Sequence, residues 1–329
     1  MHKGKHILVT GANGYLGAQF CEYLAGKGYL VTALCFPTAP TDQVWCRAMQ
    51  EVLVGSIADE ETIAQLAEKN YDTIIHLVSL DHRQSQEASM DEVLRVNVKP
   101  CWNLLHTFVS KGLKTFLFFS TVQVYGNLDS IPITENTPTN PSNVYALTHR
   151  LAEQVCDYFN QTTDVNCITV RLSNSYGHPV FPENNCWWLA VNDLCKSAFY
   201  SKKIQLLSNG SPQRDFIHGS DVCRAVETLL ERAPKKTSGN IYHISSSKTY
   251  TLLELAGLVQ ETYRMLYGER LPVNSPDEID LINFDRFAKE ARYCIENNAL
   301  RSLGFEPVCD LQEGIKKLFQ YFETHPSHA

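Results

Sequence analysis

Short apolar runs rich in β-branched residues alternate with amphipathic segments through the first half of the chain. The runs at residues 7–10, 30–34, 51–54, 73–77 and 115–120 have the length and composition of strands. Residues 60–68 and 90–110, which lie between them, carry apolar side chains at helical spacing. Strands that alternate with helices pair in parallel through right-handed crossovers. We therefore predict an α/β fold with a doubly wound parallel sheet.

The second half is less regular. Residues 130–142 are rich in Pro, Thr and Asn, and a helical pattern resumes over 144–159, with Ser142 as its expected N-cap. Beyond Arg171, helices are expected near 187–200, 222–231 and 252–266, with proline-bearing loops before them. We predict a first domain over 1–172 and a smaller α/β lobe over 173–329, some of whose chain returns to the sheet. The two parts are expected to form one cleft.

Composition narrows the class of partner. The formal net charge is -7 over 329 residues, and acidic and basic residues are mixed, so no basic stripe is available for nucleic acid or an anionic membrane. No apolar stretch approaches the ~20 residues that span a bilayer, and a strand is expected from residue 5 onward, which leaves no room for a secretion signal. The eleven cysteines include no C-x-x-C pair and are expected in the core, with no metal site. We expect a cytoplasmic protein that binds a small molecule.

A glycine-rich turn follows the first predicted strand and opens a helix. It reads Gly11-Ala12-Asn13-Gly14-Tyr15-Leu16-Gly17. Glycines at these positions let the backbone approach a pyrophosphate, and the helix N-terminus supplies unpaired N–H groups and partial positive charge. We predict a dinucleotide site in which Gly11, Asn13, Gly14, Tyr15, Leu16 and Gly17 take part. A tight turn without a ligand is the simpler alternative.

The end of the second predicted strand bears on which dinucleotide is bound. An acid at that place would read the adenosine ribose of NAD, but this chain has Cys35 there. No Arg or Lys follows between Val31 and Trp45 to meet the 2′-phosphate of NADP. We expect NAD, with NADP not excluded, and count Cys35 among the cofactor-binding positions.

Further motifs follow in a fixed order, and with the glycine turn they carry a resemblance that runs nearly end to end. The chain resembles the extended short-chain dehydrogenase/reductases, of the nucleotide-sugar epimerase and dehydratase kind, whose first domain is a Rossmann fold. The motifs are Asp72-x-x-x-His76-Leu77, Asn97 within Val96-Asn97-Val98, Ser120-Thr121-Val122-Gln123-Val124-Tyr125-Gly126, Tyr145-Ala146-Leu147-Thr148-His149, Arg171-Leu172-Ser173-Asn174-Ser175-Tyr176-Gly177, Arg214-Asp215-Phe216-Ile217-His218 and Leu303-Gly304-Phe305-x-Pro307.

The resemblance implies roles for individual residues. Tyr145 would be the acid/base that moves the proton of a sugar hydroxyl while the nicotinamide exchanges a hydride with the same carbon, and Thr121 would hydrogen-bond that oxygen. Asn174 and Arg214 would bind the sugar and diphosphate of a nucleotide-sugar substrate. The cofactor would be held also by Leu77, Asn97, Ser120, Tyr145 and His149. A structural role for Tyr145, Asn174 or Arg214 is the alternative.

The chain departs from the family at His149. Relatives carry a lysine four residues after the tyrosine, on the same helical face, and its charge favours the phenolate of a side chain whose ordinary pKa is ~10. An imidazole, with an ordinary pKa of ~6.5, weakens that effect. His149 could still bond the nicotinamide ribose and, if protonated, assist Tyr145. Otherwise it packs in a site without turnover.

The residues after Thr121 bear on the reaction. Family members that remove water from the sugar carry an acidic pair there, and this chain has Val122-Gln123, so dehydration is not expected. We predict an NAD(P)-dependent nucleotide-sugar 4-epimerase of carbohydrate biosynthesis, acting by transient oxidation at C4. The alternatives are a nucleotide-4-keto-sugar reductase or dehydrogenase, and a catalytically impaired dinucleotide-binding protein. The nucleotide and the sugar stay open, with a UDP-hexose as the default because it is the commonest substrate of the family.

The resemblance also implies a homodimer, formed through the helix that bears Tyr145 and the helix before it. Leu147, Leu151, Val155 and Tyr158 give the Tyr145 helix a second apolar stripe, which suits either a subunit interface or burial within one chain. The pair Trp187-Trp188 is expected to pack in the core or at its rim.

Overall fold

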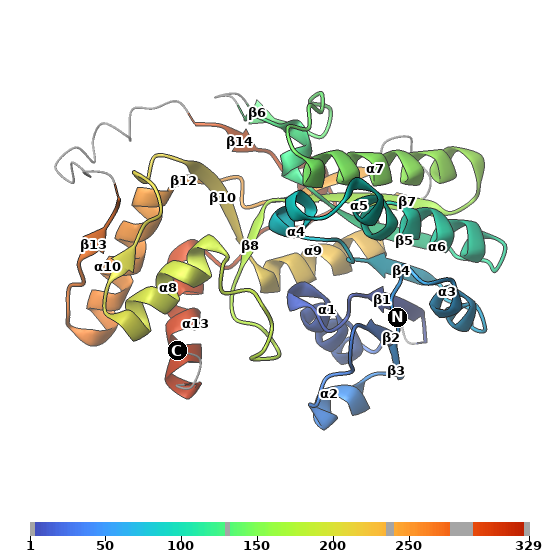
Figure 1. The fold of residues 1–329 in the computed structure, drawn as a ribbon, viewed down its shortest axis with the longest axis horizontal. Coiled ribbons are helices and arrows are strands. Elements are labelled where there is room, and N and C mark those ends of the chain that lie inside the picture. The colour runs from blue at the N-terminus through green and yellow to red at the C-terminus, as the bar shows by residue number, and fades with distance from the viewer. Residues whose placement is uncertain (1–3, 129–131, 235–239, 277–291, 326–329) are drawn as a thin grey trace.

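The computed structural model describes residues 4–128, 132–234, 240–276 and 292–325. A large lobe is built on one parallel sheet, and a smaller lobe lies beside one end of it (Figure 1). The sheet has the order β3-β2-β1-β4-β5-β7-β11, and every pairing in it is parallel. This confirms the predicted doubly wound α/β class. The strands are β1 (His6–Thr10), β2 (Leu30–Cys35), β3 (Glu51–Val54), β4 (Thr73–His76), β5 (Thr115–Thr121), β7 (Asn166–Leu172) and β11 (Ile241–Ile244).

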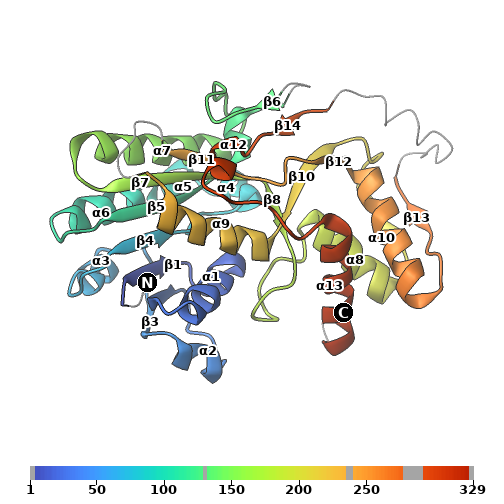
Figure 2. The same ribbon diagram turned by 180° about the vertical axis from the view of Figure 1, so that it is seen from behind.

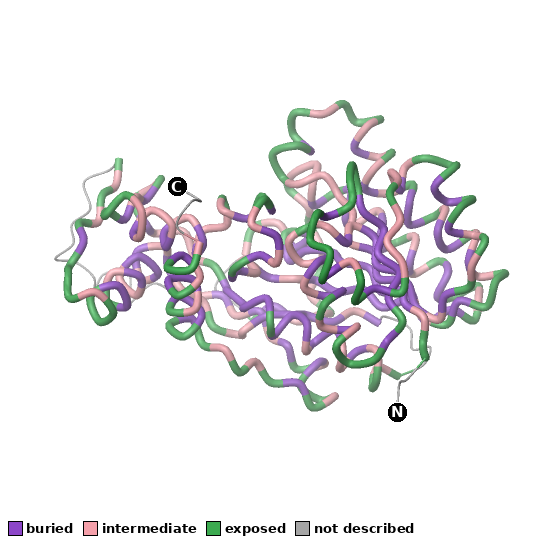
Figure 3. Tube along the Cα trace, turned by 90° about the horizontal axis from the view of Figure 1, so that it is seen from below, coloured by how far each residue is buried: buried purple, intermediate pink, exposed green. Residues whose placement is uncertain are grey.

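The two faces of the sheet are buried under different helices. Side chains alternate along each strand, so Ile7 and Val9 of β1 join one core cluster while Leu8 joins the other. The first cluster includes residues of α1 (Tyr15–Gly26), α2 (Gln43–Ala48), α9 (Gly219–Arg232) and α12 (Asn298–Ser302). The second is closed by α3 (Glu60–Leu66), α6 (Lys99–Val109) and α7 (Val144–Thr162). Buried positions follow the strands through the middle of this lobe, and exposed positions lie along the outer helices (Figure 3).

Two sequence predictions about helices need correction. The amphipathic stretch 90–110 is not one helix but two, α5 (Met90–Asn97) and α6, because the chain turns at Val98 (φ -120°, ψ -53°) and Pro100 has no N–H to continue the first helix. The N-cap of α7 is Asn143 and not Ser142. The Asn143 side chain accepts the Ala146 N–H at 2.8 Å, and the helix begins at Val144, as expected.

The smaller lobe has its own core, formed mainly by three helices around a short mixed sheet. Its helices are α8 (Ala190–Ser201), α10 (Leu252–Tyr267) and α13 (Leu311–Thr324). Its strands are β8 (Asn174–Tyr176), β10 (Gln213–His218) and β12 (Thr249–Thr251), with the pair β9 (Ile204–Gln205) and β13 (Val273–Asn274) at its side. A last pair, β6 (Pro132–Ile133) and β14 (Cys294–Ile295), lies at the top of Figure 1 with the short η1 (Val122–Tyr125) and α4 (His82–Glu87) beneath it.

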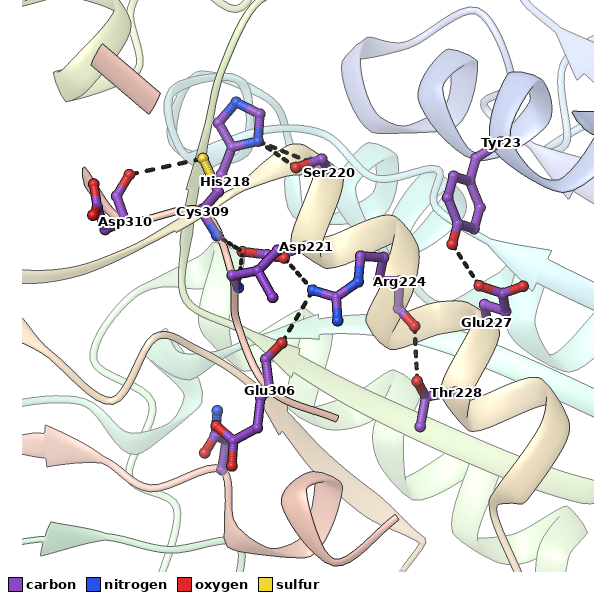
Figure 4. Close-up of polar contacts among 12 residues, drawn as sticks. Tyr23, His218, Ser220, Asp221, Arg224, Glu227, Thr228, Glu306, Cys309 and Asp310 are labelled. Carbon is purple, nitrogen blue, oxygen red and sulfur yellow. Dashed lines mark hydrogen bonds and ion pairs between the residues drawn. The ribbon is translucent and has the colours of Figure 1, made fainter. Parts of the chain in front are cut away.

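The two lobes are joined by more than one passage of the chain. After β8 and β10 in the smaller lobe, α9 and β11 belong to the large one, and β12 and α10 to the smaller one again (Figure 2). The last passage runs from α12, which packs on the large lobe, to α13 in the smaller one. The carboxylate of Asp221 on α9 holds that last passage, since it accepts the N–H groups of Val308 and Cys309 at 3.0 and 2.9 Å (Figure 4). Arg224 pairs with the same carboxylate and donates to the carbonyl of Glu306. These bonds hold the chain between the lobes against α9.

Candidate active site

The glycine turn lies where β1 ends at the carboxyl edge of the sheet. Gly11 has φ +73°, a conformation that favours glycine, and a Cβ on Gly17 would lie 2.0 Å from the Gly11 carbonyl oxygen. Gly14 is the N-cap of α1 and offers no side chain to the helix's first N–H groups. Those N–H groups and the helix dipole therefore face outward past a backbone with no side-chain bulk, as a pyrophosphate requires.

The side chains of the other turn residues hold the glycine turn in place. Asn13 donates through its side-chain amide to the carbonyls of Phe36 and Thr38 at 3.0 and 3.1 Å and accepts the Phe36 N–H, which ties the glycine turn to the loop after β2. Leu16 packs on the first core cluster. Tyr15 is largely covered, and burial raises the pKa of its hydroxyl well above the ordinary value. The sequence motif thus combines an open backbone with side chains that hold it in place.

Cys35 ends β2 with its side chain fully buried in the first core cluster. Burial raises the pKa of its thiol to about 12, so the group stays neutral at physiological pH. The exposed side chain at this corner is that of Phe36, which is 60% exposed. The position at which an acidic side chain would bind the adenosine ribose therefore presents an apolar surface and backbone groups.

Three predicted cofactor residues come from separate sequence motifs and lie on different elements: Leu77 follows β4, Asn97 is the last residue of α5, and Ser120 lies near the end of β5. The Leu77 N–H donates to the hydroxyl of Thr10. Asn97 accepts the Leu80 N–H at 2.8 Å and donates to Thr148 at 3.0 Å, so its amide joins the loop after β4 to α7. These contacts bring the ends of β1 and β4 and the first turns of α7 to one edge of the sheet.

Tyr145 lies in the first turn of α7, close to Thr121 at the end of β5. Burial raises the pKa of the Tyr145 phenol to about 12, the charge of Asp81 adds to this rise, and a hydrogen bond with the Thr121 side chain opposes it. The Thr121 oxygen also accepts the N–H of Gln123 at 3.2 Å, which orients the hydroxyl. The structure thus brings together the two residues that the sequence pairs, with the phenol in its neutral form at pH 7.

His149 lies one helical turn beyond Tyr145, and its ring centroid is 4.2 Å from that of the tyrosine. Its Nδ1 lies 2.8 Å from the backbone carbonyl oxygen of Tyr145, where a protonated Nδ1 donates. The side chain is 3% exposed, and burial lowers the pKa of the imidazole to about 4 despite the carbonyl and the charge of Glu153, which both favour the proton. The protein groups around His149 therefore leave it neutral at pH 7.

The neutral His149 predicts an acid-sensitive fold. Between pH 6.5 and 4 an unfolded chain binds a proton at this histidine and the folded chain does not, so stability is lost as pH falls through that window. The loss from this one group between pH 7 and pH 5 is roughly 2 kcal/mol. Urea unfolding of His149→Gln should show a fall in stability that is smaller by this amount. The matched control is His178→Gln, which changes an exposed histidine; equal falls in the wild type and His149→Gln would refute the prediction.

A cleft of about 740 Å³ lies between the two lobes, and the residues just before α7 form part of its wall. Two of the three predicted substrate residues line it: Asn174, which donates to the Asp215 carbonyl at 2.9 Å, and Arg214, which is exposed. The third, Thr121, is not part of the lining, although its neighbour Val122 is. Gln123 and Val122 line it as well. No acidic side chain is among the described residues of the lining, which is made of His82, Val122, Gln123, Gly126, Asn127, Leu128, Ser142, Asn143, Asn174, Trp188, Gln213, Arg214 and Tyr293.

Several residues of this lining were not singled out from the sequence, among them the aromatic side chains of His82, Trp188 and Tyr293. Trp187 packs as predicted, against Tyr321 and Phe322, but Trp188 is 57% exposed in the cleft wall, and its indole N–H donates to the Asn185 carbonyl. A single exposed side chain in a loop leaves no periodic pattern in the sequence. His82 follows a strand by six residues, and only its nearness in space to Tyr145 distinguishes it.

A buried polar cluster behind the site was also not predicted. Glu153, one turn beyond His149, pairs with Arg171 of β7 at 2.7 Å and accepts the Ser120 hydroxyl at 2.6 Å, and both charged side chains are almost wholly buried. Arg171 also donates to the hydroxyl of Tyr125 at 2.8 Å, which lies 2.5 Å from His243 Nε2. Ser120, expected to touch the cofactor, thus joins β5 to α7 through this cluster.

Other kinds of site are not found in the described residues. They contain no group of three or more His, Cys, Asp or Glu side chains placed to hold a metal ion, and no described helix is both long and apolar enough to cross a membrane. Each of the eleven cysteines is unpaired and eight are buried, which agrees with their predicted place in the core.

Comparison with known proteins agrees with the motifs. A sequence model of the NAD-dependent epimerase/dehydratase family matches residues 7–245. The dTDP-glucose 4,6-dehydratase of Streptomyces griseus is 25% identical over 98% of this chain and 95% of its own length. The solved structure of the Thermotoga maritima UDP-glucose 4-epimerase with UDP-glucose is 21% identical, with a TM-score of 0.80 over 98% of this chain and all of that chain.

A third relative was solved together with the dinucleotide. The UDP-glucuronic acid 4-epimerase of Bacillus cereus, in complex with NAD, is 19% identical, with a TM-score of 0.77 over 97% of this chain and 96% of that one. At these identities the solved structures establish the fold, and the family match, which spans well over half of the 329 residues, establishes the kinship. The chain belongs to the NAD-dependent epimerase/dehydratase family of extended short-chain dehydrogenase/reductases, and NAD is its cofactor.

Proposed function

We propose that this protein is a nucleotide-sugar 4-epimerase that oxidises C4 of the sugar transiently and returns the hydride to the other face. The relatives divide by name between 4,6-dehydratases and 4-epimerases, so kinship does not choose the reaction. The cleft favours the epimerase. Beside Thr121 it presents Val122 and Gln123, where elimination of water would need a second acid and base next to the first.

The residues at the carboxyl edge of the sheet fit NAD. The close approach of Gly17 to Gly11 and the uncapped N-terminus of α1 suit the pyrophosphate, and Cys35 leaves the adenosine ribose to backbone groups. When bound, NAD supplies the nicotinamide that takes a hydride from the substrate carbon and gives it back. Tyr145 takes and returns the proton of the hydroxyl at that carbon, and Thr121 holds the same oxygen.

The substrate would enter from the smaller lobe. Arg214 is exposed in the cleft, and its planar fork of donors suits a diphosphate. Asn174 is anchored by its amide to the Asp215 carbonyl and presents its side chain at the cleft wall, where it suits a sugar hydroxyl. We propose a UDP-hexose as substrate, because the Thermotoga maritima 4-epimerase that shares this fold was solved with UDP-glucose.

The test starts from freshly purified protein. Mass spectrometry of the supernatant after denaturation should find NAD, and incubation with UDP-glucose and UDP-galactose should interconvert them without net NADH. The same assay on dTDP- and GDP-sugars decides the nucleotide. Consumption of NADH or NADPH on a 4-keto sugar would instead establish a reductase. Bound NAD with no turnover of any sugar would establish a binding protein and refute the epimerase.

We also propose a homodimer formed through α6 and α7. Their outer face carries Trp102, Leu147 and Tyr158, which are 43, 41 and 51% exposed, and the rings of Trp102 and Tyr158 stack at 5.8 Å. Large exposed apolar groups on one surface are typical of subunit interfaces, and a second copy of the same face would cover them.

Changing Trp102 to Glu should therefore dissociate the protein, because a buried charge without a partner opposes association. Light scattering after gel filtration should give the mass of two chains for the wild type and of one chain for Trp102→Glu. Trp188→Glu, at an exposed tryptophan outside this face, is the control. A wild-type protein that elutes as a monomer would rule the interface out.

A further inference from the structure

The glycine turn is bonded to both lobes through a single residue, Asn13. The side chain of Asn13 bonds the loop after β2 in the large lobe. The backbone carbonyl of the same residue accepts the side-chain amide of Asn184 at 2.7 Å. Asn184 belongs to the 177–189 loop, which runs between β8 and α8 of the smaller lobe. The turn that suits a pyrophosphate is therefore held in part by a residue that lies 171 positions further along the chain.

The backbone around Asn184 sets its side chain for this bond. Its N–H donates to the Phe181 carbonyl at 3.0 Å, and its carbonyl accepts the Cys186 N–H at 2.9 Å. The residue is 9% exposed, and its Oδ1 has no hydrogen-bond partner in the described parts of the chain. The bond to the glycine turn is thus the one hydrogen bond of this side chain within the described residues, and it is shielded from water, which strengthens it.

The 177–189 loop also packs against the large lobe at a second point. Phe181 is 3% exposed and belongs to the first core cluster, and its ring meets that of Trp45 on α2 edge-on, with centroids 5.2 Å apart. The Trp45 indole N–H in turn donates to the Ala18 carbonyl on α1 at 3.3 Å. The loop therefore contacts α2 through Phe181 and the start of α1 through Asn184.

The base of the loop is fixed to the smaller lobe. The buried side chain of Asn192 on α8 accepts the Gly177 N–H at 3.0 Å and donates to the Gly177 carbonyl at 2.9 Å and to the Cys186 carbonyl at 3.1 Å. The His178 ring stacks on Tyr321 of α13, with centroids 5.1 Å apart and planes at 4°. A movement of the smaller lobe is therefore passed to Asn184.

We propose that Asn184 is a positioning residue for NAD, supplied by the smaller lobe. The Asn13 carbonyl belongs to the peptide that leads into Gly14, the N-cap of α1, so the bond from Asn184 fixes the last peptide before the helix. The N–H groups of the first turn of α1 are those that suit the pyrophosphate. While the bond is made, the turn keeps the shape that holds NAD, and NAD is released slowly. The inference concerns the cofactor and is independent of the reaction that the protein catalyses.

Exchange of bound NAD for deuterium-labelled NAD tests this in the purified protein, with mass spectrometry of the denatured supernatant as the readout. Asn184→Ala removes the donor and should speed the exchange roughly tenfold. Asn184→Asp sets a carboxylate against the Asn13 carbonyl and near the pyrophosphate, and should speed it roughly a hundredfold. Asn185→Asp makes the same change of charge at the next residue, which is exposed, and should exchange as the wild type does. Unchanged exchange in Asn184→Asp, or equal acceleration in Asn185→Asp, overturns the proposal.

A second readout separates positioning of the cofactor from a structural role of the loop. Coupling between two sites is reciprocal, so NAD should slow hydrogen–deuterium exchange of the amides in the 177–189 loop of the wild type. In Asn184→Ala this protection by NAD should be lost. If Asn184 were only structural, the substitution would speed amide exchange to the same extent with NAD bound and after its removal, and that result refutes the coupling. Neither readout requires turnover of a sugar, so both stand apart from the proposed epimerase activity.

Discussion

Tyr145→Phe is expected to lower turnover of the nucleotide sugar by roughly a thousandfold, the usual size of a lost general acid/base. The substitution removes only the hydroxyl, and that hydroxyl is the group beside Thr121 that can take a proton from the substrate. The packing of the ring against His149 and His82 does not depend on it. The measurement is the rate of sugar interconversion, together with the NAD content of the purified variant and the affinity for the nucleotide sugar.

Binding should survive where turnover does not, since a phenyl ring keeps the shape of the site. Tyr158→Phe is the matched control: it removes a tyrosine hydroxyl from the same helix at an exposed position, and it should leave the rate unchanged. A Tyr145→Phe variant within a few-fold of the wild-type rate would exclude the acid/base role. Loss of bound NAD would show that the hydroxyl holds the cofactor as well.

Arg171→Met is expected to reduce the free energy of unfolding by roughly 3–5 kcal/mol, because it leaves the buried carboxylate of Glu153 without its main partner. Arg171 donates twice to that carboxylate, at 2.7 and 3.0 Å, and both side chains are at most 3% exposed. The neighbouring Arg150, 3.3 Å from Glu153, is only partly buried and replaces little of the lost attraction. Urea unfolding at pH 7 measures the effect.

Two controls separate the buried charge from the loss of a large side chain. Arg264→Met breaks an exposed pair with Glu261, which is half exposed on both sides, and should cost less than ~1 kcal/mol. The double variant Arg171→Met/Glu153→Gln removes both charges and should be more stable than Arg171→Met alone. If Arg171→Met and Arg264→Met lose the same stability, the cluster does not stabilise the site as described.

The cluster also bears on why α7 holds its place. Tyr145 lies in its first turn beside Thr121, His149 lies one turn later, and Glu153 on the turn after that is bonded to Ser120 of β5 and Arg171 of β7. Helix α7 thus carries Tyr145 in its first turn and is bonded to the sheet through Glu153, two turns later. We infer that the position of Tyr145 relative to Thr121 depends on these buried bonds.

Local patterns in the sequence were enough for the first half of the fold. The five strands expected at 7–10, 30–34, 51–54, 73–77 and 115–120 appear within one residue of those bounds. All but the edge strand β3 are mostly buried, and a strand buried on both faces is a continuous apolar run bounded by polar turns. The glycine turn was readable for a similar reason, since its φ angle and its close backbone contact are local properties. The strands β7 and β11 were not among those expected, although they complete the sheet.

The sequence by itself therefore determined the fold class, the family, the dinucleotide turn and the pairing of Tyr145 with Thr121, because each depends on periodicity or on residues at a fixed spacing. Only the tertiary structure decided the protonation of His149, the burial of Cys35, the Glu153–Arg171 pair and the nearness of His82 to Tyr145, 63 residues further along the chain. Charge and hydrogen bonding depend on solvent exposure and on neighbours in space. Neither can be read from the order of residues until the chain has folded.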